Sequence, residues 1–114
     1  DEAIISINDF DCSVGFSGNS PREMENRLIA IDFASGAVHT IDQQKGFKNI
    51  FSTPWIGDMD HDGYLDIINC QYFHHSYLLS FTGMRVKRIA LPIRMKNEVS
   101  WGGYMGSSGD GVLR

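Results

Sequence analysis

Hydrophobic residues along the chain occur in short runs that have the alternation of β-strands. Ile, Val, Leu, Phe and Tyr fill these runs, and clusters of Gly, Asn, Asp, Ser and Pro separate them. No segment has the period of a long helix. The pattern therefore predicts an all-β chain with strands near residues 3–7, 27–33, 37–42, 51–56, 66–73, 76–81, 85–91 and 99–104.

One motif that starts at a tryptophan is written twice. The stretch W-I-G-D-M-D-H-D-G at 55–63 is matched by W-G-G-Y-M-G-S-S-G-D-G at 101–111, which has two further residues before its aspartate. Upstream of these stretches, Val38 corresponds to Val86, 48 positions later. A repeat of this length with four short strands is typical of a β-propeller blade.

The repeat divides the chain into two predicted four-stranded blades. The first covers residues 1–63 and contains a polar insertion at 11–26, and the second covers 64–114. Propellers close with about four to eight blades, so about two blades are incomplete alone. We therefore expect a fragment of a longer propeller or a short chain assembled from several copies, because a lone segment would expose broad apolar faces.

The most distinctive polar stretch is G-D-M-D-H-D-G-Y-L-D, whose loop spans 58–66. Counted from its first aspartate, aspartates stand at positions 1, 3, 5 and 9, glycine at 6 and tyrosine at 7. Alternate side chains of a wrapped loop point inward, and the glycine permits the bend. Position 7 adds its backbone carbonyl, so the loop approaches the six to eight oxygen ligands that Ca²⁺ requires. The predicted metal ligands are Asp58, Asp60, Asp62, Asp66 and the carbonyl of Tyr64.

Other interpretations of the loop fit this pattern less well. An EF-hand would carry glutamate at position 12, where Asn69 stands, and helices where strands are predicted. Mg²⁺ demands octahedral geometry, and transition metals prefer His or Cys, whereas His61 stands at an outward-facing position. A solvated acidic turn remains open as an alternative. Without an ion, repulsion between the carboxylates is expected to leave the loop loose.

The corresponding loop at 105–111 differs in its ligands. Of its acidic positions only Asp110 remains, and Gly and Ser occupy the others. Because carboxylates supply most of the ligands in such loops, we expect no ion in this second copy.

The stretch S-T-P-W-I-G-D-M-D-H-D-G-Y-L-D-I-I at 52–68 resembles the FG-GAP or VCBS repeat, whose D-x-D-x-D-G-x-x-D loops bind Ca²⁺ in β-propeller blades. The stretch N-R-L-I-A-I-D-F-A-S-G-A-V-H-T-I-D at 26–42 is similar to a quinoprotein-like blade. The F-G and G-A-P elements of the FG-GAP repeat are not evident in the chain. The resemblance implies the same five ligands for a Ca²⁺ ion that supports the fold. It also implies an extracellular, cell-surface or periplasmic setting.

Composition and charge narrow the range of partners. The chain has 114 residues, 42% of them hydrophobic, and a net charge of −4, which provides no positive field for nucleic acid. No apolar run approaches the roughly 20 residues of a membrane span. The basic stretch 85–96 is interpreted as a soluble edge strand. Cys12 and Cys70 permit one disulfide in an oxidising compartment, or two buried thiols.

The leading functional hypothesis is a non-catalytic, calcium-stabilised propeller module that serves adhesion, ligand binding or assembly. Its expected partners are the remaining blades or copies of itself, and a protein or carbohydrate ligand that the insertion at 11–26 would contact. An alternative is part of a secreted, lyase-like propeller enzyme acting on polysaccharide, in which the calcium is structural. A third is a fragment of a quinone-cofactor dehydrogenase.

Overall fold

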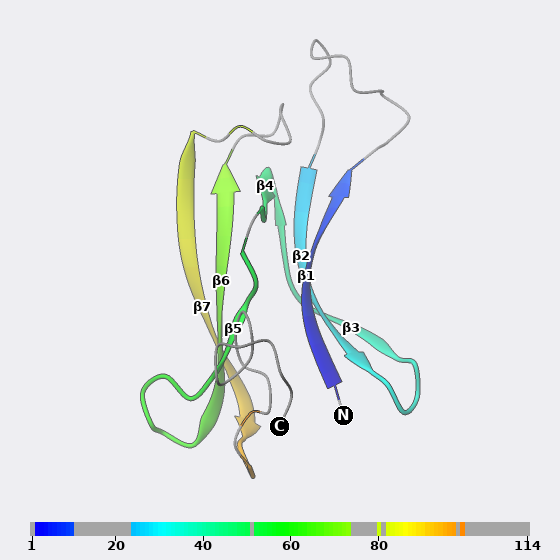
Figure 1. Ribbon diagram of the computed structural model, residues 1–114, viewed down its shortest axis with the longest axis vertical. Coiled ribbons are helices and arrows are strands. Elements are labelled where there is room, and N and C mark those ends of the chain that lie inside the picture. Colours follow the sequence, from blue (N-terminus) through cyan, green and yellow to red (C-terminus); the bar gives the residue numbers. More distant parts are fainter. Residues whose placement is uncertain are drawn as a thin grey trace, which may run out of the picture. The chain divides into compact units, whose positions relative to one another are not determined.

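A computed structural model describes residues 2–10, 24–50, 52–73, 80, 82–97 and 99 of the chain. These residues form β-strands and no helix, so the all-β prediction is confirmed (Figure 1). Within this part of the chain, no helix has the length and apolar character that a membrane crossing needs. The strands are β1 (Glu2–Phe10), β2 (Met24–Asp32), β3 (Val38–Lys45), β4 (Phe47–Lys48), β5 (Trp55–Gly57), β6 (Tyr64–Phe73) and β7 (Gly83–Arg94).

Six of the predicted strands overlap strands of the structure, with different ends. β1 and β2 extend beyond the predicted runs because their ladder continues through polar pairs such as Asn8 with Asn26. The strand predicted at 51–56 shortens to β5, which begins only after Pro54, a residue without an N–H to donate. β4 is missing from the prediction.

Two of the predicted strands are largely outside the described residues. Of the strand predicted at 76–81 only Ser80 is described, and of that at 99–104 only Val99, and neither is in a strand. The division into blades at 1–63 and 64–114 stays a prediction. By its contacts the chain splits into two compact units, Asp1–Phe51 with Gln71–Arg85 and Ser52–Cys70 with Val86–Arg114.

The first unit contains a three-stranded antiparallel sheet in the order β1-β2-β3 (Figure 1). The turn between β2 and β3 forms because its own side chains bond its backbone. Asp32 accepts hydrogen bonds from Ala34 N at 3.0 Å and from the Ser35 hydroxyl at 2.5 Å. Gly36 supplies the positive φ of 73° that the turn requires. These local bonds set how β2 and β3 begin to pair.

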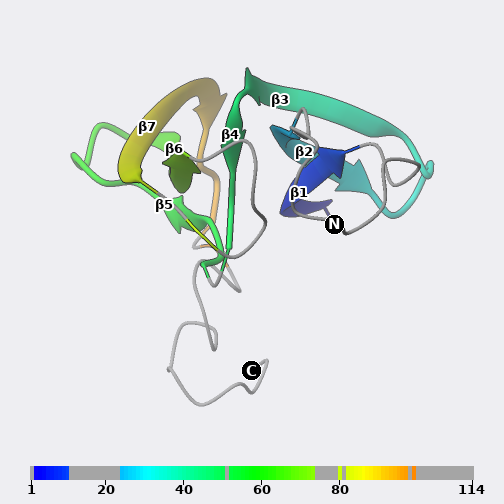
Figure 2. The ribbon, with the colours of Figure 1, turned by 90° about the horizontal axis from the view of Figure 1, so that it is seen from above.

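The second unit contains β5 and the adjoining parts of β6 and β7 (Figure 2). β6 pairs with β7 and is antiparallel to β5, with Gly57 opposite Asp66. Trp55 and Gly57 share one face of β5 because they are two residues apart. A Cβ on Gly57 would be 2.6 Å from the Trp55 ring, so the glycine makes room for the indole. This contact gives the W-x-G part of the first copy of the motif, at 55–57, a steric reason.

Many of the side chains that the described residues bury are polar. In the first unit Met24 and Leu28 are buried on β2 with Asn26 between them, and Gln71 is also buried. In the second unit Ile67 is buried beside polar residues of β6. Buried polar groups are stable only when they are hydrogen-bonded, so each unit depends on a polar network.

Lys48 in the first unit is fully buried, and its ammonium donates to the carbonyl of Ser80. Burial lowers the pKa of Lys48 because the charged form loses water.

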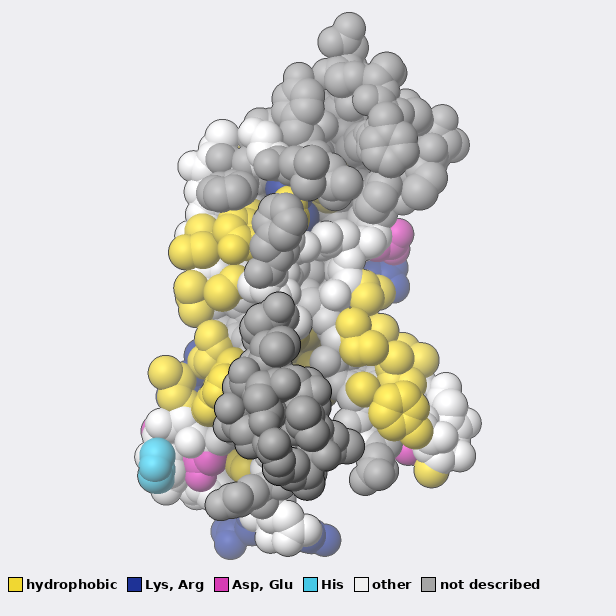
Figure 3. Space-filling view, in the orientation of Figure 1, with side chains coloured by type: hydrophobic (Ala, Val, Ile, Leu, Met, Phe, Trp, Pro, Cys, Tyr) yellow, Lys and Arg dark blue, Asp and Glu magenta, His cyan; other side chains and the backbone are white. Residues whose placement is uncertain are grey.

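Several large hydrophobic side chains of the described residues are exposed. Figure 3 shows hydrophobic groups on the face it presents. The exposed set includes Phe33, Val38, Met84, Val86 and Ile93, each more than half accessible. The described residues therefore carry apolar surface as well as buried polar groups.

Candidate metal centre in the acidic loop

The acidic loop connects β5 to β6, and strand pairing closes its base. Asp58 follows the last residue of β5, and Asp66 pairs with Gly57 across the two strands. The loop wraps back because His61 and Gly63 have positive φ values of 62° and 85°. His61 is exposed. The loop thus returns the chain to its starting point within a few residues and gathers its side chains.

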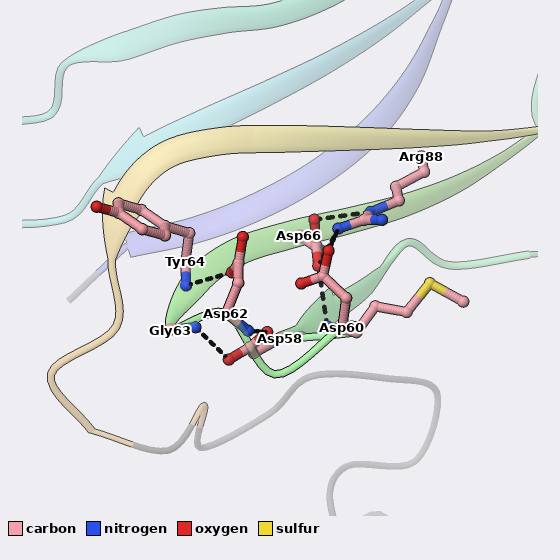
Figure 4. A network of polar contacts seen from close by, with 8 residues as sticks. Asp58, Asp60, Asp62, Gly63, Tyr64, Asp66 and Arg88 are labelled. Carbon is pink, nitrogen blue, oxygen red and sulfur yellow. Dashed lines mark hydrogen bonds and ion pairs between the residues drawn. The ribbon is translucent and has the colours of Figure 1, made fainter.

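Two of the aspartates hold the turn by accepting backbone hydrogen bonds. Asp58 accepts from Asp62 N at 3.1 Å and from Gly63 N at 2.8 Å. Asp62 accepts from Tyr64 N at 2.8 Å (Figure 4). Short polar side chains that bond to nearby N–H groups are a common way to stabilise turns. Part of the acidic pattern is therefore used to shape the loop.

Asp66 is the buried carboxylate of the loop, with 2% of the residue exposed. One of its oxygens accepts from Met59 N at 2.9 Å. Arg88 on β7 binds both oxygens, through Nε at 2.9 Å and Nη2 at 3.0 Å. This two-point contact compensates for the burial of the charge.

The same guanidinium reaches a second aspartate. Arg88 Nη2 donates to Asp60 Oδ2 at 2.5 Å, so one cation lies between two carboxylates (Figure 4). The hydrogen bonds from Arg88 lower the pKa of Asp60 and, with the N–H of Met59, that of Asp66. In turn, Asp66 and Asp60 raise the pKa of Arg88. All three groups are therefore charged at neutral pH, and the repulsion expected to loosen the loop is partly offset within the chain.

Three of the predicted ligands lie close enough together to hold a metal ion. Asp58, Asp60 and Asp66 each place a carboxylate oxygen within 4.8 Å of the others. Their hard oxygen donors fit Ca²⁺ better than they fit softer metals. Asp62 is outside this group, with one oxygen turned to Tyr64 N, and the role of the Tyr64 carbonyl stays a prediction.

Arg88 is the functional residue that the sequence interpretation missed. The stretch 85–96 was expected to be an edge strand, and its charges were assigned to solubility. One signal was present: Arg88 is on the strand that follows β6, and a cation on a neighbouring strand can meet a carboxylate. Nothing in the sequence, however, shows which of the basic residues of β7 reaches the loop.

The other sequence candidates are mostly outside the described residues. This holds for Asp110 with its loop at 105–111, for Cys12 and for residues 11–23 of the predicted insertion. The last three residues of the predicted insertion at 11–26 are described and belong to β2, because they pair with β1, so its predicted end was wrong. Cys70, which is described, has a free, half-buried thiol. The expectation that the second loop binds no ion therefore stays a prediction.

Comparisons of the chain with protein-family models, with curated proteins and with solved structures found no match. The resemblance to FG-GAP and VCBS repeats consequently rests on the residues of the loop and its flanking strands.

Proposed function

We propose that the chain is a calcium-stabilised, non-catalytic β-propeller repeat module that serves adhesion, ligand binding or assembly. The observation that carries this proposal is the convergence of Asp58, Asp60 and Asp66 in a loop between two paired strands. Oxygen ligands from such a loop are the type that Ca²⁺ selects. The ion's role is to fix the connection between β5 and β6.

The location of the acidic group supports a structural ion. Asp58 begins the loop and Asp66 belongs to β6, so an ion bound to both would join the two ends of the connection. Binding to the folded state alone stabilises it by about 2.7 kcal/mol when free Ca²⁺ exceeds its Kd by about a hundredfold. For a chain of this size, such a gain raises Tm by about 10 °C.

The protonation of the same residues argues against a catalytic role. A general acid or base works best when its pKa is near the working pH. Arg88 instead holds the pKa of Asp60 and of Asp66 below the usual value. These carboxylates therefore neither donate nor accept protons readily at neutral pH. They are suited to binding a cation.

The proposed setting and partners follow from calcium availability and from blade number. Loops of this kind with modest affinity are loaded where calcium is millimolar, which favours an extracellular, cell-surface or periplasmic location. The proposed partners are further propeller blades or copies of this chain, together with a protein or carbohydrate ligand. Exposed apolar residues on β3 and β7 are consistent with contacts to further blades.

Thermal unfolding of the full chain tests the proposal. We expect Tm, followed by circular dichroism, to rise by about 10 °C from chelator to millimolar Ca²⁺, and to rise less with Mg²⁺. Asp60→Asn should remove most of the calcium response because it removes one charged ligand.

Asp9→Asn is the matched control. Asp9 is also an exposed aspartate paired with an arginine, Arg27, at 2.9 Å, but it is on β1. This variant should respond to Ca²⁺ as the unmodified chain does. Equal Tm values in chelator and in Ca²⁺ would exclude the proposed role of calcium.

A further inference from the structure

A cation of the chain itself already binds the acidic loop. Arg88 contacts two of the three carboxylates that converge, Asp60 and Asp66. Its hydrogen bonds to them have donor–acceptor distances of 2.5 to 3.0 Å. It uses both oxygens of Asp66, one of which also accepts from Met59 N. The oxygens that a metal ion would need are thus shared with a guanidinium.

An ion and this guanidinium would be close neighbours. Ca²⁺ binds its oxygens at about 2.3–2.6 Å. Arg88 Nη2 is 2.5 Å from Asp60 Oδ2 and 3.0 Å from Asp66 Oδ2. An ion on either of these oxygens would therefore be within about 6 Å of Nη2, where like charges repel strongly. Full contact of both cations with the same carboxylates is unfavourable.

The side chain of Arg88 can move away from Asp60 because both groups are partly exposed to solvent. Its side chain is 40% exposed, and that of Asp60 is 45% exposed, so this pair forms at the surface. Asp66, by contrast, has a side chain only 3% exposed. Breaking the contact with Asp60 leaves both groups hydrated, whereas breaking the contact with Asp66 leaves a buried carboxylate that needs another cation. The contact with Asp60 is therefore the easier one to exchange.

We propose that Arg88 is an intramolecular competitor of the metal ion at this loop. When calcium is low, Arg88 binds Asp60 and Asp66 and keeps the loop folded. When calcium binds, Arg88 leaves at least Asp60. The competition raises the calcium concentration at which the loop is loaded and links loading to the position of a side chain on β7. This inference rests on the proposed binding of Ca²⁺ by the loop.

Calcium affinity of the full chain and of two arginine variants tests the competition by isothermal titration calorimetry. Arg88→Gln should bind Ca²⁺ about tenfold more tightly, or better, because it removes the competing charge. The matched variant is Arg85→Gln, which removes the same charge from the same strand. Arg85 donates to the neutral Gln71 at 2.6 Å and not to the acidic loop. The affinity of Arg85→Gln for Ca²⁺ should therefore stay within about twofold of that of the unmodified chain.

A second measurement does not depend on the folding of Arg88→Gln. The Nη–H resonances of the Arg88 guanidinium report on the contact with Asp60, because Nη2 makes that contact. In the unmodified chain these resonances, assigned by NMR through loss of the signals in Arg88→Lys, should shift and exchange faster as Ca²⁺ is added. The Nη–H resonances of Arg85 should not change.

The outcomes separate the two proposals. Equal affinity of the unmodified chain and Arg88→Gln, or an Arg88 resonance that stays unchanged while calcium binds, overturns the competition and leaves the calcium proposal intact. Absence of binding at millimolar Ca²⁺ in the unmodified chain and in both variants overturns both.

Discussion

Arg85 and Arg88 are three residues apart on β7, and they serve different kinds of polar network. Arg85 donates to the amide oxygen of Gln71 at 2.6 Å, within the first unit. Arg88 binds Asp66 and Asp60, within the second unit. One arginine therefore joins a group of neutral amides, and the other joins a group of carboxylates.

The network of the first unit is centred on a buried asparagine. Asn26 accepts from Gln71 Nε2 at 2.9 Å and donates to the hydroxyl of Ser6 at 2.9 Å and the carbonyl of Ile7 at 3.1 Å. None of these groups titrates near neutral pH. Arg85 also lies 4.3 Å from the centre of the Phe47 ring. Such a network holds strands in register and is indifferent to metal ions.

The network of the second unit is charged and partly exposed. Asp60 and Arg88 are accessible to solvent, and the pKa values of both are displaced by their mutual contact. Its stability therefore depends on pH and on competing cations. The same residue type on one strand therefore gives a fixed support where its acceptor is neutral and an exchangeable contact where its acceptors are acidic.

The largest expected effect comes from breaking the neutral network. Asn26→Leu removes the partner of the buried Gln71 amide and should lower the free energy of unfolding by about 2 kcal/mol, because an unpaired buried polar group is costly. Urea denaturation should give the same loss with chelator and with Ca²⁺. Gln43→Ala, at an exposed amide of β3, is the control and should change stability by less than about 0.5 kcal/mol. If the loss of unfolding free energy in Asn26→Leu differed between chelator and Ca²⁺, the neutral network would not be independent of metal ions.

A smaller effect is expected from a change in the backbone of the acidic loop. Gly63 has a φ of 85° and nothing within 4 Å of an added Cβ, so Gly63→Ala costs only backbone strain, about 1 kcal/mol. Gly63→Asn should cost less because asparagine tolerates this conformation better. Gly83→Ala on β7 also has free space, and no positive φ is found there, so it should not destabilise the fold. Equal urea midpoints for Gly63→Ala and Gly83→Ala would show that the loop does not depend on this turn.

The smallest effect is expected in acid, where the charged network loses its carboxylates. Because folding lowers the pKa of Asp60 and Asp66, their contribution to stability is present above the usual value near 3.9. It is lost as pH falls through the lowered values. Urea midpoints from pH 7 to pH 3 in chelator should therefore fall more for the unmodified chain than for Arg88→Gln. Arg85→Gln should follow the unmodified chain, and identical slopes for all three would refute the assignment.

Sequence reasoning succeeded where neighbouring residues decide the structure. The strands follow from alternation, as in the predicted run 27–33, most of which belongs to β2 and in which Leu28 is buried. The turn of the loop follows from Gly63, and the spacing of the aspartates brings Asp58 close to Asp60. Each of these features depends on residues a few positions apart, whose relative geometry the backbone restricts.

The features that sequence reasoning missed depend on residues far apart. Asn26 and Gln71 are 45 positions apart, and Asp66 and Arg88 are 22 apart. Asp66 meets Arg88 because β6 pairs with β7, and Asn26 meets Gln71 because strands of two different sheets pack together. Local sequence preferences specify neither arrangement. β4 was missed for the same reason, since its two residues are a strand only through pairing with Tyr72 and Phe73.

The acidic loop combines features that its local sequence determines with a contact that only the tertiary structure determines. Its composition and its turn are written in ten consecutive residues, because charge and glycine conformation are local properties. Which cation meets those carboxylates is not local: pairing of β7 with β6 brings Arg88 to Asp66, and the wrapped loop brings Asp60 to the same guanidinium. The sequence thus specifies an anionic loop, and the packing of a neighbouring strand supplies the charge that balances it.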